Sequence, residues 1–114
     1  MRSSRPVSWI RAARKAFDAF PDQVRATVEF ALAIAAEGRK PDNAKPLHGL
    51  GSGVMEIVAG ERSGTYRVVF AVQIGEDIWV LHAFQKKSTS GIKTPVHEID
   101  VVRERLKRLK DSLR

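Results

Sequence analysis

The sequence lacks several features that would indicate common classes of protein. It contains no cysteine, which excludes a disulfide framework and a metal site built on thiolates. No apolar run approaches the length of a membrane span, and Met1 to Pro6 lead into no segment that resembles a signal peptide. We therefore expect a cytoplasmic protein without a membrane partner.

Motifs for several catalytic chemistries are also missing. The three histidines, His48, His82 and His97, show no i, i+4 pairing on a helix and no neighbouring carboxylate cluster, so we predict neither a metal site nor another cofactor. The spacings of a serine triad and of a nucleophile elbow are absent. The glycine-rich stretch 45–53 lacks the spacing and the strand-before-helix context of a nucleotide-binding loop.

Basic residues, in contrast, are abundant and unevenly distributed. The 114 residues include 20 Lys and Arg against 13 Asp and Glu, a formal net charge of +7. Residues 1–18 hold five basic groups and one acidic group, and residues 86–114 hold nine basic and four acidic, whereas the middle of the chain is slightly acidic. A clustered positive field fits a polyanion, with nucleic acid as the first candidate.

The length and the patterning predict one α+β domain over residues 1–114. We expect a strand at 6–10, helices at 11–19 and from 21 to about 38, a polar loop at 39–46, and strands at 54–59, 65–74 and 78–84. A last helix should follow Thr94, which precedes Pro95 as an N-cap residue would. The short links between strands favour an antiparallel meander with the helices against one face.

The hairpin from Gly64 to Lys87 carries the candidate site. A loop of residues 75–77 would pair Arg67 with Gln85 and place Lys87 diagonal to it, and a loop of 76–77 would pair Arg67 with Lys86. In both registers a guanidinium and an ammonium share one end of one face. Like charges across a ladder repel, so this placement favours a bound anion. We expect the row of residues 65, 67, 69, 71 and 73 to be open to a ligand; the alternative is a solvated face with a few basic residues.

Positive charge without an obvious base suits a reaction in which the substrate supplies the nucleophile. In RNA the 2′-hydroxyl can attack the adjacent phosphodiester, so an enzyme need only align it and stabilise the developing charge. Arginine makes bidentate contacts to phosphate oxygens, and lysine supplies a mobile point charge.

The chain resembles the RelE/HigB toxin superfamily, and specifically its phage-derived HigB-like branch. The resemblance runs in order from about Pro6 to about Leu109 and is carried by Lys45-Pro-Leu-His-Gly-Leu, Gly53-Val-Met-Glu-Ile, Thr65-Tyr-Arg-Val-Val-Phe, Leu81-His-Ala-Phe-Gln-Lys-Lys-Ser88 and Lys93-Thr-Pro95. It implies a RelE-like α+β fold, with an antiparallel sheet of about four strands, two N-terminal helices and a C-terminal helix. It also implies the toxin of a type II toxin-antitoxin pair, a ribosome-dependent endoribonuclease that cleaves mRNA and is neutralised by a helix-turn-helix antitoxin.

The resemblance also implies roles for particular residues. Arg67 matches the strand arginine that contacts the scissile phosphate in RelE-type toxins, and Lys87 and Lys86 match the basic position that ends the next strand. The sequence departs from RelE where that toxin has two strand lysines, here Glu56 and Val58, and a tyrosine, which has no counterpart near Thr94. The general base is therefore open, and the candidates are His48, His82 and His97. Four residues are candidates for binding RNA: Lys45, Lys93, Phe84 and Trp79.

Two other functions remain open. Relatives in the superfamily poison DNA gyrase by binding it, and such a toxin would need no base. A basic RNA-binding regulatory module is the third hypothesis, although the chain lacks an aromatic-rich sheet motif of the RRM kind.

Overall fold

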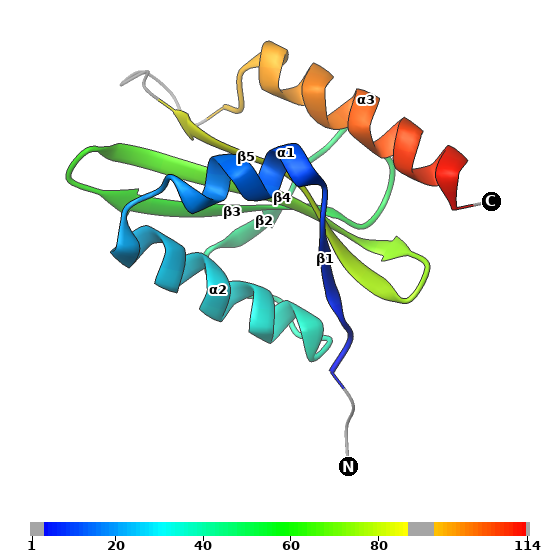
Figure 1. The fold of residues 1–114 in the computed structure, drawn as a ribbon, viewed down its shortest axis with the longest axis horizontal. Coiled ribbons are helices and arrows are strands. Elements are labelled where there is room, and N and C mark those ends of the chain that lie inside the picture. Colours follow the sequence, from blue (N-terminus) through cyan, green and yellow to red (C-terminus); the bar gives the residue numbers. More distant parts are fainter. Residues whose placement is uncertain (1–3, 87–92, 114) are drawn as a thin grey trace.

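The computed structural model describes residues 4–86 and 93–113, which form three helices and five strands (Figure 1). Their order along the chain is β1 (Val7–Trp9), α1 (Arg11–Asp18), α2 (Asp22–Ala36), β2 (Ala44–Pro46), β3 (Val54–Glu61), β4 (Gly64–Ile74), β5 (Asp77–Lys86) and α3 (Val96–Ser112). The predicted helices and long strands are therefore confirmed. The short strand β2 is new, because three residues that end in a proline carry no strand pattern.

The five strands form one sheet in the order β1-β5-β4-β3-β2. Strand β1 runs parallel to β5, and the other neighbours are antiparallel. The α+β class is confirmed, with a mixed sheet in place of a purely antiparallel one. Strands β1 and β5 can be parallel because no hairpin joins them: α1, α2 and the strands β2, β3 and β4 lie between them in the sequence.

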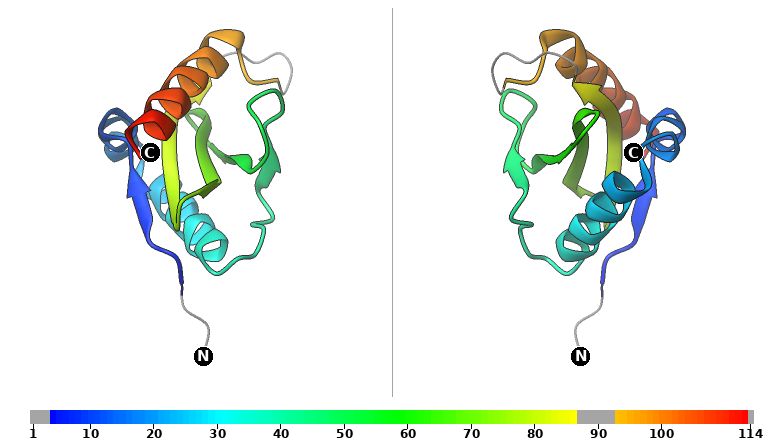
Figure 2. Two further views of the ribbon diagram at one scale, coloured as in Figure 1. Left: turned by 90° about the vertical axis from the view of Figure 1, so that its right-hand side faces the viewer. Right: turned by 90° about the vertical axis from the view of Figure 1, so that its left-hand side faces the viewer.

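Helices cover both faces of the sheet, so the expectation of helices against one face is wrong (Figures 1 and 2). On one face, Phe17 of α1 and Val28 of α2 pack with Val68 and Phe70 of β4. On the other face, α3 packs its apolar seam, Val102, Leu106 and Leu109, onto Val69, Ala71 and Leu81. Burial of apolar side chains on both sides makes the central strands β4 and β5 the middle layer of the molecule.

The β4–β5 hairpin adopts neither expected register. Ile74 pairs with Asp77, so Gly75 and Glu76 form the turn, and Gly75 has a φ of 62° that favours glycine. Register shifts between Ala71 and Ile74 and between Val69 and Phe70 cancel each other, so the outer half of the ladder keeps the register that the turn sets. As a result Arg67 pairs with Phe84 and Thr65 pairs with Lys86. Because cross-strand partners share a face, Arg67 and Lys86 still lie on the same side of the sheet.

Candidate functional site

Arg67 is buried in an ion pair on the α3 side of the sheet. Its side chain is 4% exposed, and its Nη1 donates a hydrogen bond to Glu56 Oε1 at 3.0 Å. The expectation that its row is open to a ligand is therefore wrong, since Val69 and Ala71 in the same row are also buried. The sequence could not show this, because the cover comes from α3, which lies far along the chain.

Glu56 is the carboxylate around which this site is built. It is fully buried on β3, and Thr94 Oγ1 lies 3.0 and 2.8 Å from its two carboxylate oxygens. Lys45 Nζ on β2 lies 3.9 Å from Oε1. Because burying a carboxylate is costly unless it is paired and hydrogen-bonded, these contacts compensate the burial of Glu56.

One donor of Arg67 is unsatisfied. Its Nε is buried and has no hydrogen-bond partner among residues 4–86 and 93–113. Buried guanidinium nitrogens normally donate to an acceptor, so an orphaned one is a common sign of a functional site. The ion pair with Glu56 therefore leaves the Nε–H group of Arg67 without an acceptor in the described residues.

Lys86 ends β5 next to this cluster and is 7% exposed. Its Nζ donates to the backbone carbonyl of Lys93 at 2.8 Å. Burial lowers the pKa of Lys86, and the positive charge of Arg67 lowers it further, while Glu56 opposes the change. A lysine with a lowered pKa releases its proton more readily and can serve in acid–base chemistry. Lys87, which we expected to act beside it, lies outside the described residues.

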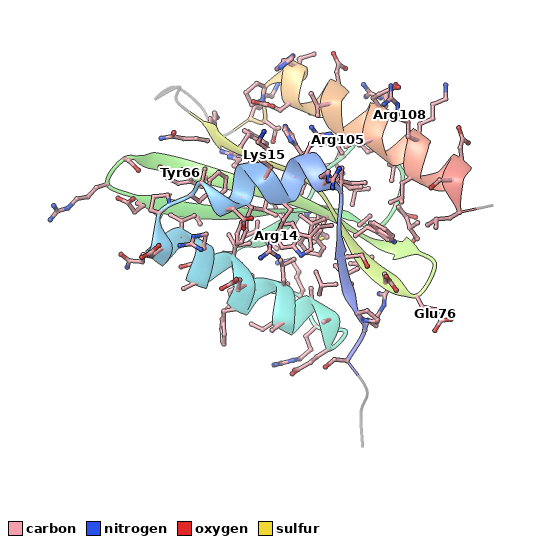
Figure 3. All side chains as sticks on the ribbon, viewed as in Figure 1. Arg14, Lys15, Tyr66, Glu76, Arg105 and Arg108 are labelled. Atoms are coloured by element: carbon pink, nitrogen blue, oxygen red, sulfur yellow. The ribbon has the colours of Figure 1, made fainter. Side chains whose placement is uncertain are left out.

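His82 belongs to a second polar cluster between β5 and α3. Its Nε2 lies 2.7 Å from Glu98 Oε1, and Arg105 donates to Nδ1 at 3.1 Å and to the Leu81 carbonyl at 2.9 Å. A guanidinium can only donate, so Nδ1 accepts and the neutral ring carries its proton on Nε2, pointing at Glu98. Burial is the largest cause that lowers the pKa of His82, and the hydrogen bond with Glu98 opposes it. Figure 3 shows Arg105 on α3 beside the sheet.

The other sequence candidates lie in varied surroundings. His48 and His97 are exposed, in the loop after β2 and in the first turn of α3, and Lys93 is exposed as well. Phe84 is buried and its ring stacks on His82 at 4.9 Å between centroids. Trp79 packs against the α3-side core, opposite Ala71. The structure thus brings together Arg67, Lys86 and Lys45, with Phe84 behind them, and leaves His48 outside this cluster.

The sequence analysis did not identify Glu56 and Glu98, the acidic residues of the two clusters. Glu56 was seen only as a departure from RelE, yet a charged residue inside the apolar strand 54–59 is itself a sign of a buried pair. Thr94 does not cap α3: the helix begins at Val96 without a side-chain cap, and the Thr94 hydroxyl turns to Glu56. Glu98 and Arg105 carried no signal, because charged residues on a terminal helix usually face solvent.

Neither a metal-binding cluster nor a membrane-spanning helix is found in the described part of the chain. Within residues 4–86 and 93–113, no group of three His, Cys, Asp or Glu side chains gathers closely enough to hold a metal ion. No helix in that part of the chain has both the length and the apolar character needed to cross a membrane.

Comparisons with known proteins identify relatives of this fold. The family model described as phage-derived protein Gp49-like matches residues 15–107, whereas no curated protein matches the chain. A free-state double arginine-to-alanine mutant of the E. coli toxin RelE is 20% identical, with a TM-score of 0.63, and the match covers 93% of this chain and 98% of that one. The isolated E. coli RelE toxin is also 20% identical, with a TM-score of 0.58 and coverage of 89% and 99%.

Proposed function

We infer that this chain, which belongs to the phage-derived Gp49-like family and has the RelE fold, is the toxin of a type II toxin-antitoxin pair. The proposed activity is ribosome-dependent endonucleolytic cleavage of mRNA in the cytoplasm. Its proposed partners are the ribosome with its mRNA and a helix-turn-helix antitoxin. The family and the fold support the toxin; the cleavage rests on the chemistry of the Arg67 cluster.

The observation that carries this proposal is the unsatisfied Nε of Arg67 among three cations and one carboxylate. Lys45, Arg67 and Lys86 surround Glu56, so the cluster has an excess of positive charge. A phosphate oxygen that accepts a hydrogen bond from Nε would satisfy the buried donor and compensate this charge. The cluster suits the phosphodiester of RNA better than a neutral ligand.

In the proposed reaction the 2′-hydroxyl of the substrate is the nucleophile. Its oxygen forms a bond to phosphorus while the bond from phosphorus to the 5′-oxygen of the next nucleotide breaks, which leaves a 2′,3′-cyclic phosphate. Glu56 is the carboxylate nearest to Arg67 and takes the 2′-hydroxyl proton, in place of the three histidines considered from sequence. Lys86, whose pKa is lowered, gives a proton to the leaving oxygen, and Arg67 stabilises the phosphorane.

Access to this site requires the segment before α3 to move. Thr94 Oγ1 contacts both oxygens of Glu56, and the Lys93 carbonyl holds Lys86. A substrate phosphate would replace these contacts, and the exposed Lys93 would then meet the RNA backbone together with Lys45. Phe84 and Trp79 have no proposed role in base stacking, because the Phe84 ring is buried against His82 and the half-buried Trp79 packs against the α3-side core.

The proposal is tested by expressing the chain without its antitoxin and mapping the 5′ ends of cellular mRNA. We expect growth arrest with new 5′ ends inside translated reading frames. The variants His48→Gln and His97→Gln should cleave like the parent if Glu56 is the base. DNA breaks that depend on gyrase, without mRNA cleavage, would instead assign the gyrase-binding function, and a chain that does not arrest growth would contradict both.

A further inference from the structure

A cavity of about 370 Å³ lies on the α2 side of the sheet, the face opposite Arg67. It forms because α2 ends at Ala36 while β3 and β4 continue beyond the helix. Gly38, with a φ of 86°, turns the chain away there. The half-buried Met55 and Val72, with the buried Phe70 between them and the helices, therefore form an apolar floor. The volume is within the range of about 300–1,000 Å³ typical of binding pockets.

Three cations stand around this apolar floor, and no carboxylate is among the residues that line it in the described part of the chain. Arg5 is held in place by hydrogen bonds from Nε to the Glu76 carbonyl at 2.9 Å and from Nη2 to the Asp77 carbonyl at 3.0 Å. Arg39 and Lys40 follow the end of α2 and are exposed, and Arg39 Nη2 lies 3.0 Å from Oε1 of the exposed Glu37, so an incoming carboxylate would compete with Glu37 for Arg39. An apolar floor with a cationic rim is complementary to an apolar side chain flanked by carboxylates.

The cavity is remote from the candidate catalytic cluster. Figure 3 shows Tyr66, the neighbour of Arg67, towards one end of the sheet and Glu76, whose carbonyl binds Arg5, at the turn of the other end. The intervening sheet separates the two sites, because Phe70 and Arg67 point to opposite faces. A ligand in the cavity would therefore leave the Glu56–Arg67 pair uncovered.

We propose that this cavity is a docking site for an acidic segment of the antitoxin, which inserts one large apolar side chain between the end of α2 and the sheet. Carboxylates on either side of that side chain meet Arg5, Arg39 and Lys40. The identity of the partner rests on the proposed function, whereas the chemistry of the segment follows from the cavity itself. The site anchors the antitoxin, and inhibition of the catalytic cluster requires a second contact elsewhere.

Two other occupants fit the cavity less well. RNA would bring phosphates to the rim, but Phe70 is only 1% exposed and offers no open ring face on which a base could stack. A second copy of this chain would bring its own cations to the rim, and the net charge of +7 opposes that contact. Both occupants are outcomes that the experiments below distinguish.

The antitoxin of such a pair is expected to be encoded next to the toxin. The first experiment therefore measures the affinity of the full-length chain for the purified protein encoded by the adjacent reading frame. The double variant Arg39→Glu and Lys40→Glu should bind at least tenfold more weakly than the parent and with a shallower dependence on salt. The control is Lys107→Glu with Lys110→Glu, which makes the same change in charge on α3 and should bind within threefold of the parent. Equal weakening in the two variants, or no binding by the parent, would overturn the proposal.

The second experiment uses the absence of cysteine in the chain. Val72→Cys places one thiol on the half-buried floor of the cavity, and Ser112→Cys places one on the exposed end of α3. The adjacent-frame protein should slow alkylation of the thiol at position 72 at least tenfold and leave position 112 unchanged. Protection of position 72 by an RNA oligonucleotide, or by raising the concentration of the chain alone, would assign the cavity to RNA or to a second copy.

Growth assays separate this proposal from the proposed function. If both are correct, the Arg39→Glu and Lys40→Glu variant arrests growth like the parent but is no longer rescued by the adjacent-frame protein. If the parent does not arrest growth while weakened binding and thiol protection are both observed, the docking site stands and the toxin function fails. Rescue of the variant as complete as that of the parent would contradict the docking site.

Discussion

Arg67 and Glu56 form a buried ion pair, with 3.0 Å between Nη1 and Oε1, on neighbouring strands beneath the start of α3. The pair couples stability to the proposed chemistry, because the same carboxylate and guanidinium would act on the RNA. Replacing either Arg67 or Glu56 alone should therefore affect folding as well as function. Experiments on this site must separate the two effects.

The first prediction concerns the two members of this pair. Arg67→Met alone should lower the free energy of unfolding by about 3–5 kcal/mol, because it leaves Glu56 buried without its main partner. The double variant Glu56→Leu and Arg67→Met should recover most of that loss, since an apolar pair can replace a buried ion pair. Urea denaturation measures both values.

The double variant then tests catalysis in a folded protein. If Arg67 and Glu56 act on RNA, it should be folded but should not cleave mRNA or arrest growth. Growth arrest by the folded double variant at the level of the parent would remove both residues from the mechanism.

A second prediction concerns Thr94, whose hydroxyl lies within hydrogen-bonding distance of both oxygens of Glu56. Thr94→Val keeps the shape of the side chain and removes this contact, so unfolding should become easier by about 1–3 kcal/mol. Amide hydrogen exchange should increase in the first turn of α3. The matched control is Thr27→Val at an exposed position of α2, which should change the free energy of unfolding by less than about 0.5 kcal/mol. Equal effects of the two substitutions would show that Thr94 does not hold α3 to Glu56.

The third prediction is a pH dependence that belongs to His82. In the folded state its pKa is lowered below the ordinary value of 6.5 for histidine, chiefly by burial. The unfolded chain therefore binds the proton first as the pH falls, and the stability contributed by the neutral ring is lost below about pH 6.5. Urea denaturation at pH 8 and pH 5.5 should show a larger loss for the parent than for His82→Gln. The exposed His48, replaced by Gln, is the control and should keep the pH response of the parent.

The fourth prediction tests whether α3 is part of the core. Leu106 is 6% exposed in the α3-side core, whereas Phe30 on α2 is 71% exposed. Leu106→Ala should lower the free energy of unfolding by about 2–5 kcal/mol. Phe30→Ala should change it by less than about 0.5 kcal/mol, although it removes a larger side chain. If thermal denaturation showed only a small destabilisation by Leu106→Ala, the packing of α3 on the sheet would contribute little to the stability of the fold.

Much of the fold was predictable because its signals are local. The alternation of side chains along β4 separates Tyr66, Val68 and Phe70, which lie in the core under α1 and α2, from Val69 and Ala71, which lie under α3. The buried residues of α3, Val102, Leu106 and Leu109, likewise recur at three- and four-residue steps. The hairpin register was wrong because the turn is formed by Gly75 and Glu76, whereas residues 75–77 are compatible with several two- and three-residue turns. Arg67 and Lys86 do share a face, as the register with a loop of residues 76–77 required, whereas the register with a loop of residues 75–77 would have placed Lys87 there.

The sequence by itself determined the helices and long strands, the absence of thiol chemistry, and the presence of Arg67 and a lysine pair at the same end of two neighbouring strands. These follow from side-chain periodicity and composition, which act over a few residues. Only the tertiary structure decided that Glu56 pairs with Arg67 and that Thr94, 38 residues after Glu56 in the sequence, contacts the Glu56 carboxylate. Contacts between such distant residues depend on how α3 docks on the sheet, and that docking is set by the packing of the whole core.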